Sequence, residues 1–356
     1  MTATSMLLPA VSRSQRDHLD DVAVAVIGCG NHSTTAILPS LRHAPMRLVA
    51  VCDLDRGRAE SARRLFGAEA AYTSIDDVLA RSDVEGVLIV GPPDLHVSAG
   101  LAALESGRHV FIEKPPGNSL SDAMRLQQAS RAAARQLMLG FMKRHASAYR
   151  LVKQITASDE FGAITSVHIT YAHWSVGGIR PHLMDMSIHA LDTVRWLLGN
   201  PLRVTSYKRP VRDNHALALM FEHRSGAISQ LNLSAFQPGV QEQLVVTGED
   251  AIVRVDNLTQ LAYVRQAPNT SIYDANTRLT SVWSPEFPLP DRENDVLILQ
   301  GYATEMIAFA DAIRRGERVS ASIDDGVAAM RLIEAIADAP IGMATVELNE
   351  GDTAEP

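Results

Sequence analysis

The stretch Val22–Ser33, with the sequence VAVAVIGCGNHS, decides the fold. It begins with six apolar residues, the length of a buried strand, and Gly28-Cys29-Gly30 follows directly. A strand with no polar face must be covered on both sides, as the strands of a parallel sheet are. A glycine turn between such a strand and a helix presents backbone N–H groups to a bound phosphate. The stretch therefore predicts the start of a doubly wound, dinucleotide-binding sheet.

Short apolar strands alternate with helices from this stretch as far as residue 141. The further strands are expected at residues 48–52, 86–90, 109–112 and 136–141, and the helices up to about residue 43 and at 56–66, 95–106 and 119–135. This α/β alternation is typical of a Rossmann domain, in which helices cover both faces of a parallel sheet.

The pattern changes after residue 142, where β-rich segments replace the alternation. Strands are expected at residues 164–173, 203–208, 216–222, 227–233, 243–247 and 251–255, and helices at 145–157, 187–198, 301–315 and 324–338. The short turns between these strands favour antiparallel neighbours. We predict a flexible extension or partner-binding arm (1–20), a Rossmann domain (21–142), a substrate-binding and oligomerisation α+β domain (143–346) and a tail (347–356). The last helices of the segment 143–346 can pack against the Rossmann domain in this prediction.

Length and charge limit the classes of function. A chain of 356 residues exceeds one compact core of ordinary size, which agrees with two domains. Its 33 basic and 41 acidic side chains give a formal net charge of −8, which argues against nucleic acid as a partner. No apolar run reaches the ~18 residues of a membrane span, and the N-terminus lacks the pattern of a signal peptide. We predict a cytoplasmic protein with neither nucleic acid nor membrane as a partner.

The chain has two cysteines, Cys29 and Cys52, and both lie in apolar, strand-like runs. Two residues cannot form a disulfide framework, and no Cys/His spacing typical of zinc is present. We interpret both as buried, reduced thiols that pack as small apolar groups.

The glycine turn has the geometry that a dinucleotide requires. Gly28 allows the tight turn, Gly30 allows the backbone to approach a pyrophosphate, and the N–H groups near Asn31 and His32 open the helix. The third fingerprint position is Ser33 instead of glycine or alanine, so the match is imperfect. Because the turn stands between a strand and a helix, we predict cofactor contacts from Gly28, Gly30, Asn31 and His32.

Asp53 ends the second strand, where a carboxylate can accept hydrogen bonds from the adenosine ribose. A 2′-phosphate would be repelled there, so Asp53 favours NAD over NADP. Arg56 and Arg58 follow closely and leave NADP open, since an arginine can attract that phosphate. Arg58 is a candidate cofactor contact.

Residues 90–116 read VGPPDLHVSAGLAALESGRHVFIEKPP, and Asp185-Met-Ser-Ile-His-Ala-Leu-Asp192 follows later. Together with the glycine turn, these motifs resemble the Gfo/Idh/MocA oxidoreductases, which include glucose–fructose oxidoreductase and the inositol dehydrogenases. The resemblance covers about residues 22–345, with the motifs in the family's order. It implies a Rossmann domain and a C-terminal domain with an open, largely antiparallel sheet. That sheet would join the subunits of a homodimer or homotetramer.

The resemblance also implies further contacts with the cofactor. Matching positions are Pro92 and His96 in the Pro-x-x-x-His stretch, Glu113 and Lys114 in Glu-Lys-Pro, and the basic residue Arg144. The last of these has an alternative interpretation as half of an interdomain surface pair.

Lys114 is one of only four lysines, with Lys143, Lys153 and Lys208. It follows an apolar strand, at the edge of the sheet where open α/β folds bind ligands. An ammonium group there can donate to a substrate oxygen and stabilise developing negative charge. Lys114 is therefore a candidate catalytic and substrate-binding residue.

The Asp185–Asp192 motif brings two carboxylates and an imidazole to one helix face. At ~100° per residue, Asp185, His189 and Asp192 fall within an arc of roughly 60°. A histidine titrates near neutral pH, which suits proton transfer coupled to hydride transfer. By resemblance, Lys114, Asp185 and His189 are the catalytic trio, and the same residues bind substrate. Asp192 is assigned only to positioning the helix.

His182 has two interpretations. With Asp185 and His189 it forms a spacing that could bind zinc, but we assign no metal and predict that His182 lines the substrate pocket. Ser187 stands where a glycine is common in the family, and the segment 177–184 is longer than usual. The identity of the substrate is therefore the property that the resemblance predicts least.

We predict an NAD(P)-dependent oxidoreductase that moves hydride between nicotinamide and a CH–OH or keto carbon. The expected substrate is polyhydroxylated: a sugar, an inositol or a nucleotide-linked keto-sugar. One alternative is a redox-neutral glycosidase that uses tightly bound NAD, and another is a non-catalytic, dinucleotide-sensing protein.

Overall fold

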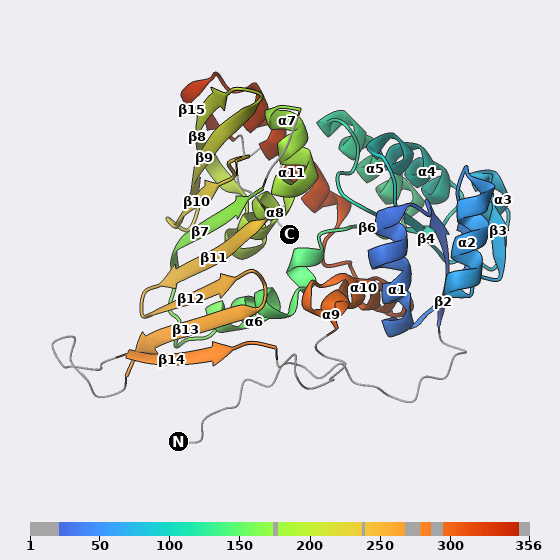
Figure 1. Cartoon of the computed structure of the whole chain (residues 1–356), viewed down its shortest axis with the longest axis horizontal. Helices are drawn as coiled ribbons and strands as arrows, with labels where there is room; N and C mark the ends of the chain where they lie inside the picture. Colours follow the sequence, from blue (N-terminus) through green and yellow to red (C-terminus); the bar gives the residue numbers. More distant parts are fainter. Residues whose placement is uncertain (1–20, 174–176, 237–238, 268–277, 286–294, 349–356) are drawn as a thin grey trace.

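A computed structural model describes residues 21–173, 177–236, 239–267, 278–285 and 295–348. The predicted extension 1–20 and all but the first two residues of the tail 347–356 lie outside these ranges. The two sheets lie on opposite sides of the view in Figure 1, with helices between them. No helix in the described ranges is both long enough and apolar enough to cross a membrane.

Sheet A is the predicted Rossmann sheet. It has six parallel strands in the order β3-β2-β1-β4-β5-β6, the order of a dinucleotide-binding fold. The strands are β1 (Val22–Ile27), β2 (Met46–Cys52), β3 (Ala70–Tyr72), β4 (Gly86–Ile89), β5 (His109–Ile112) and β6 (Leu137–Leu139). Every residue of β1 is buried, as its apolar sequence predicts. The short, half-exposed β3 has no strong apolar pattern and was not predicted.

The helices of this domain are α2 (Arg56–Phe66), α3 (Ile75–Leu79), α4 (Pro93–Glu105) and α5 (Leu120–Ala133). The first crossover differs from the single helix that the sequence predicts. It winds as a π-helix η2 (Ser33–Ile37), a short α1 (Leu38–Ser40) and a 3₁₀ turn η3 (Leu41–His43). Pro39 lacks the N–H that a regular helix needs there, which accounts for the wider turn before it.

Sheet B has nine strands in the order β14-β13-β12-β11-β7-β10-β9-β8-β15. They are β7 (Ile164–Ala172), β8 (Pro201–Val211), β9 (Asn214–His223), β10 (Ile228–Asn232), β11 (Gln241–Gly248), β12 (Ala251–Asp256), β13 (Gln260–Gln266), β14 (Arg278–Trp283) and β15 (Gly342–Glu347). All neighbours are antiparallel except β7 and β10. This confirms the predicted largely antiparallel sheet, although β13, β14 and β15 were not predicted.

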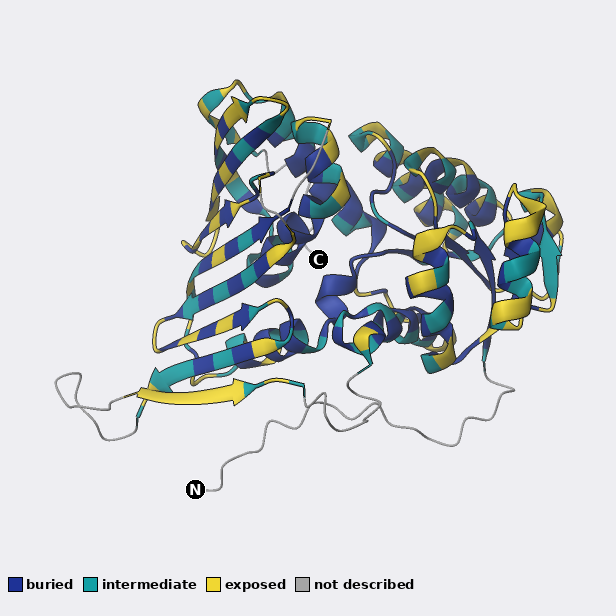
Figure 2. Ribbon diagram, viewed as in Figure 1, coloured by how far each residue is buried: buried dark blue, intermediate teal, exposed yellow. Residues whose placement is uncertain are grey.

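Residues alternate between buried and exposed along the strands of sheet B (Figure 2). The buried face packs against α6 (Ser147–Thr156), α8 (Ile188–Leu198) and α11 (Ile323–Asp338). The other face carries exposed apolar side chains.

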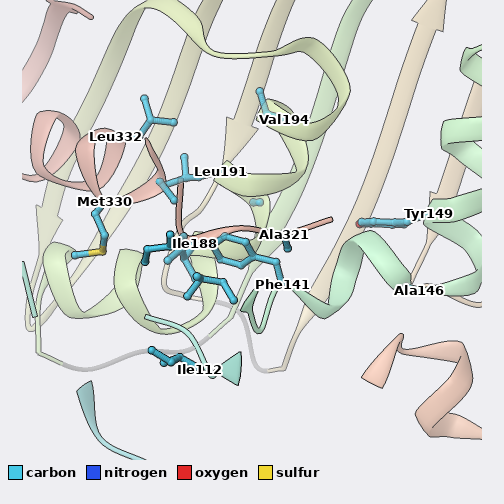
Figure 3. Close-up of a cluster of buried hydrophobic side chains, with 14 of the residues drawn as sticks. Ile112, Phe141, Ala146, Tyr149, Ile188, Leu191, Val194, Ala321, Met330 and Leu332 are labelled. Carbon is cyan, nitrogen blue, oxygen red and sulfur yellow. The ribbon is translucent and has the colours of Figure 1, made fainter. Parts of the chain in front are cut away.

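The C-terminal helices return to the first domain. Phe309 of α10 (Tyr302–Arg315) packs against Phe111 of β5 with ring centroids 6.1 Å apart. Leu139 of β6 donates a backbone hydrogen bond to Ala321, just before α11. Figure 3 shows the apolar cluster where the two parts meet, with Phe141 and Ile188 at its centre. The remaining short helices are η4 (Met142–His145), α7 (Ile179–His182), η5 (Leu183–Ser187) and α9 (Val296–Leu299).

Candidate active site

A cavity of about 810 Å³ lies at the carboxyl ends of β1, β4 and β5, the edge of an open α/β sheet where ligands bind. On the Rossmann side it is lined by Gly30, Asn31, His32, Ser33, Val90, Gly91, Pro93, Glu113, Lys114, Pro115, Asn118, Gly140 and Met142. On the opposite side it is lined by Tyr171, Pro181, Met184, Asp185, Met186 and His189, and Tyr302, whose ring centroid lies 5.5 Å from that of His32, completes the wall. The cavity therefore joins the predicted cofactor turn to the predicted catalytic trio.

The glycine turn excludes a side chain at Gly28 and leaves open space beside Gly30. Gly28 has φ +94°, and a Cβ there would lie 1.9 Å from the carbonyl oxygen of Val90, so only glycine fits. A Cβ on Gly30 would meet no protein atom within 4 Å, because Gly30 borders the cavity. Ser33 is fully buried, and its hydroxyl has no hydrogen-bond partner among the described residues.

Asp53 is held at the end of β2 by several donors. Its Oδ2 accepts from the Cys29 N–H at 2.8 Å, and its Oδ1 accepts from the Arg58 guanidinium at 2.7 Å. Burial raises the pKa of Asp53, but the hydrogen bonds from Arg58, Asp55 and Cys29 outweigh it and hold that pKa below its usual value. Asp53 is therefore an ionised acceptor beside the glycine turn, and the half-exposed Arg58 side chain donates to it.

The thiols of Cys29 and Cys52 are free and buried, as predicted. Burial, with Asp53 as the next cause, raises the pKa of Cys29 to about 12 and that of Cys52 to about 11. Both are unreactive at neutral pH because the thiolate is disfavoured.

His96 is buried behind the cavity wall and joins two loops. Its Nε2 accepts from the Gly91 N–H at 3.2 Å, and its Nδ1 donates to the carbonyl oxygen of Pro115 at 2.8 Å. Burial lowers its pKa, so the ring stays neutral. The predicted contacts Pro92 and His96 are thus not on the wall itself; they support the loops that form it.

Glu113 anchors the Rossmann side of the cavity. Its Oε1 lies 3.1 Å from His32 Nε2, and its Oε2 accepts from the Lys114 N–H at 3.2 Å. A Cβ on Gly140 would stand 2.8 Å from this carboxylate, which explains the glycine at that position. The predicted residues His32, Glu113 and Lys114 are brought together.

Lys114 crosses the cavity to the second domain. Its Nζ donates to the main-chain oxygen of Asp185 at 2.6 Å and lies 3.4 Å from Asp185 Oδ1. The Asp185 side chain is 69% exposed, so it faces the open cavity. The ammonium and carboxylate groups are therefore available together to a bound hydroxyl.

His189 lies in the first turn of α8 with 6% of its surface exposed, on the cavity wall. Its ring packs edge-on against Phe141, with centroids 6.4 Å apart. Burial, followed by the ammonium groups of Lys114 and Lys143, lowers the pKa of His189 well below 6.5. His189 is neutral at physiological pH and can accept a proton.

The regular helical arc predicts that Asp192 shares the cavity face with Asp185 and His189. In the structure it does not. Residues Leu183–Ser187 wind as the π-helix η5, so Asp185 lies outside the regular helix α8 that carries His189 and Asp192. Asp192 points into the interior, where Arg144 binds it through two hydrogen bonds. Arg144 is buried in this ion pair and is absent from the cavity wall among the described residues, whereas the sequence predicts a cofactor contact there.

His182 is also turned away from the cavity. It is fully buried, stacked on His173 with centroids 4.5 Å apart and edge-on to His215 at 4.8 Å. Burial, with the two neighbouring histidines, lowers its pKa to about 4. The predicted pocket-lining role therefore has no geometric support. No three His, Cys, Asp or Glu side chains in the described ranges form a group able to hold a metal ion.

Several wall residues were not predicted. Tyr171 ends β7 and Tyr302 begins α10, while Met184 and Met186 flank Asp185. Burial raises the pKa of both tyrosines, so each phenol stays a hydrogen-bond donor. The alternation of Met-Asp-Met was a signal that two apolar side chains accompany Asp185, but nothing local indicated Tyr302.

A parallel sheet with a glycine turn, joined at one cavity to a Lys–Asp–His set, defines a dinucleotide-dependent oxidoreductase. Residues 22–141 match the oxidoreductase family with an NAD-binding Rossmann fold, and residues 149–254 match the GFO/IDH/MocA C-terminal domain. The chain belongs to the Gfo/Idh/MocA family of oxidoreductases. This confirms the family, the fold and the prediction of an oxidoreductase acting on CH–OH groups with an NAD-binding domain.

The chain is similar to several dehydrogenases. The inositol 2-dehydrogenase of Burkholderia vietnamiensis (strain G4 / LMG 22486) is 29% identical over 324 residues, 86% of this chain and 90% of that protein. A dehydrogenase structure from Chromobacterium violaceum has a TM-score of 0.82 at 26% identity, covering 89% of this chain and 95% of that one. Levoglucosan dehydrogenase in complex with NADH has a TM-score of 0.77 at 20% identity, covering 89% and 96%, and shows the likeness of the fold alone.

Proposed function

We propose that the protein is an NAD-dependent dehydrogenase of a sugar, an inositol or a nucleotide-linked keto-sugar. The observation that carries this proposal is the convergence of Lys114, Asp185 and His189 on the cavity that the glycine turn borders. The inositol 2-dehydrogenase to which the chain is similar supports a polyhydroxylated substrate. In this proposal residues 21–142 bind the cofactor and residues 143–346 bind the substrate.

The residues around the glycine turn suit NAD. Gly28 allows the tight turn, Gly30 leaves space for a pyrophosphate, Asn31 and His32 border that space, and Asp53 offers an ionised acceptor to a ribose. A negative Asp53 repels a 2′-phosphate, so NAD is preferred; Arg58 keeps NADP as the alternative. Bound NAD supplies a hydride acceptor at its nicotinamide ring.

The chain's own residues supply binding and proton transfer. Lys114 donates from its ammonium group to the oxygen that becomes a carbonyl, and so stabilises its developing negative charge. The neutral imidazole of His189 accepts the hydroxyl proton. Asp185 accepts a hydrogen bond from a neighbouring hydroxyl of the substrate. In the direction of reduction the same groups act in reverse.

We propose that two or four copies assemble through the open face of sheet B. This face exposes Tyr207, Met220, Ile228, Ile252 and Met343 on neighbouring strands, and an apolar sheet face of this kind is normally covered. The mass of the protein in solution, measured by light scattering, tests the assembly: a monomer contradicts it.

The experiment that tests the function is a substrate panel with a cofactor readout. Purified protein with NAD and a series of inositols and sugars is expected to produce reduced nicotinamide. Lys114→Ala and His189→Ala lose turnover, and in His189→Ala the binding of NAD, measured by calorimetry, remains. Lys153→Met removes a lysine that donates to the Trp196 carbonyl away from the cavity, and should retain turnover.

Two outcomes would favour other functions. Product formed without a net change in the redox state of retained NAD indicates the redox-neutral glycosidase. Dinucleotide binding without turnover on the whole panel indicates a sensing protein.

A further inference from the structure

Lys143 is a buried lysine that the proposed chemistry does not use. It lies in η4 with 5% of its surface exposed, and its Nζ donates to Glu242 Oε2 at 2.5 Å. The other oxygen of Glu242, on β11, accepts from the Tyr149 hydroxyl at 2.7 Å. Tyr149, Glu242 and Lys143 thus form one buried chain of hydrogen bonds.

Such a buried ion pair is not required for packing. Removing two charges from water is costly, and apolar residues of similar volume often give equal or greater stability at such positions. The place of the Lys143 ammonium group, beside the cavity, suggests that its charge serves the site instead of the packing.

The ammonium group of Lys143 lies directly behind the cavity wall. Its Nζ is 5.6 Å from the centroid of the Tyr171 ring, which lines the cavity. Two residues earlier, Phe141 contacts the ring of His189, and η4 packs against α8. Lys143 therefore lies beside the wall residue Tyr171, on a turn that packs against the helix of His189, and its charge is one of those that act on the His189 imidazole.

The groups that face His189 come from four segments. Lys114 approaches from the loop after β5, Lys143 from η4 and His32 from the turn after β1, while Asp185 precedes His189 on its own chain segment. Burial is the first cause of the lowered pKa of His189, and the two ammonium groups follow.

We propose that Lys143 is a positioning residue for the reaction: with Lys114, its ammonium group sets the electrostatic potential at the His189 imidazole, while Glu242 and Tyr149 hold it in place. The proposal rests on the proposed function, because it assigns His189 as proton acceptor. The proton leaves the substrate hydroxyl for an imidazole nitrogen, and the adjacent positive charge favours its onward release to water. Glu242 limits the effect, since its carboxylate partly neutralises Lys143.

The test follows the titration of His189 directly and needs no substrate. Protein labelled with ¹³C-histidine is titrated by NMR, and the His189 resonance is assigned by its loss in His189→Gln. Lys143→Met is expected to raise the pKa of His189 by about one unit, since a buried cation is removed and Glu242 remains. Glu242→Gln is expected to shift it in the opposite direction, because Lys143 loses its counter-charge.

Three further variants separate charge from structure. The double variant Lys143→Met/Glu242→Gln avoids an unpaired buried carboxylate and should titrate between the two single variants. Lys143→Arg keeps the charge, and Tyr149→Phe removes a hydroxyl without changing any charge, so both should titrate near the wild type. Equal shifts of one sign in Lys143→Met and Glu242→Gln, or none in either, would overturn the proposal.

The acidic limb of kcat/KM against pH gives a second readout on the same variants. It should move in the same order as the NMR titration. If no substrate is turned over, the proposed function fails while the NMR titration still decides the role of Lys143.

Discussion

The guanidinium of Arg144 donates to both oxygens of Asp192, at 2.8 and 2.6 Å, in the interior between η4 and α8. Arg144 also donates to the Ser320 carbonyl at 2.7 Å and to Asp325 at 2.9 Å, at the start of α11. Because Asp192 lies three residues after His189, this ion pair fixes the turn of α8 that presents the imidazole to the cavity.

Breaking this ion pair should lower the free energy of unfolding and leave the affinity for NAD unchanged. Arg144→Met leaves the buried carboxylate of Asp192 and the partly buried carboxylate of Asp325, and Arg195, 3.7 Å from Asp192, compensates only in part. We expect a loss of about 3 kcal/mol in the free energy of unfolding by urea. The double variant Arg144→Met/Asp192→Leu should recover part of it. A weaker affinity for NAD with unchanged stability would instead support a direct cofactor contact by Arg144.

The cofactor half of the site could be predicted because its signals are local. Gly28, Gly30 and Asp53 stand at strand ends, and the order of strands places their main-chain atoms together whatever the side chains do. Lys114 was found for the same reason. Their positions depend on the sheet, which the apolar runs of the sequence predict well.

The substrate half depends on tertiary packing that no local pattern contains. A regular helix would bring Asp185, His189 and Asp192 to one face, but Asp185 lies in the π-wound η5 and Asp192 turns inward to Arg144. Likewise, His182 and Arg144 are polar residues near the site in sequence, and only the packed structure shows that they face inward. Tyr302 reaches the cavity from a helix distant in sequence, since α10 returns to the Rossmann domain.

Asp53 should control the choice of cofactor. Asp53→Ser removes the carboxylate that repels a 2′-phosphate and leaves Arg58 without its partner. We expect the ratio of kcat/KM for NAD over NADP to fall about tenfold or more, equivalent to about 1.4 kcal/mol. Arg58→Gln is the matched control and should not improve NADP. An unchanged ratio in Asp53→Ser would mean that the ribose binds elsewhere.

Oxidation should tolerate mild acidity. Because the pKa of His189 lies well below 6.5, the imidazole stays neutral when the pH falls through that of an ordinary histidine. The kcat/KM for oxidation, measured from about pH 5 to pH 9, is expected to hold its plateau past pH ~6.5 and to fall only in more acidic solution. His189→Gln should lower the plateau roughly 100- to 10,000-fold and remove the acidic limb. An acidic limb centred near that of a free histidine would contradict the assignment.

Glu305 should make stability depend on pH. It is fully buried on α10, and neither carboxyl oxygen has a hydrogen-bond partner among the described residues. Burial, with the carboxylates of Glu113 and Asp192, raises the pKa of Glu305 well above 4.5. A pKa raised by folding contributes stability that is complete below the unfolded value and is lost as the pH rises toward the folded value.

From about pH 4.5 upward the wild type should therefore lose about 1.4 kcal/mol per pH unit relative to Glu305→Gln, whose amide is always neutral. Urea unfolding of both proteins at about pH 5 and pH 8 measures this difference. The exposed Glu317→Gln is the control and should follow the wild type at both values; a constant gap between wild type and Glu305→Gln would show that Glu305 is ionised in the folded protein.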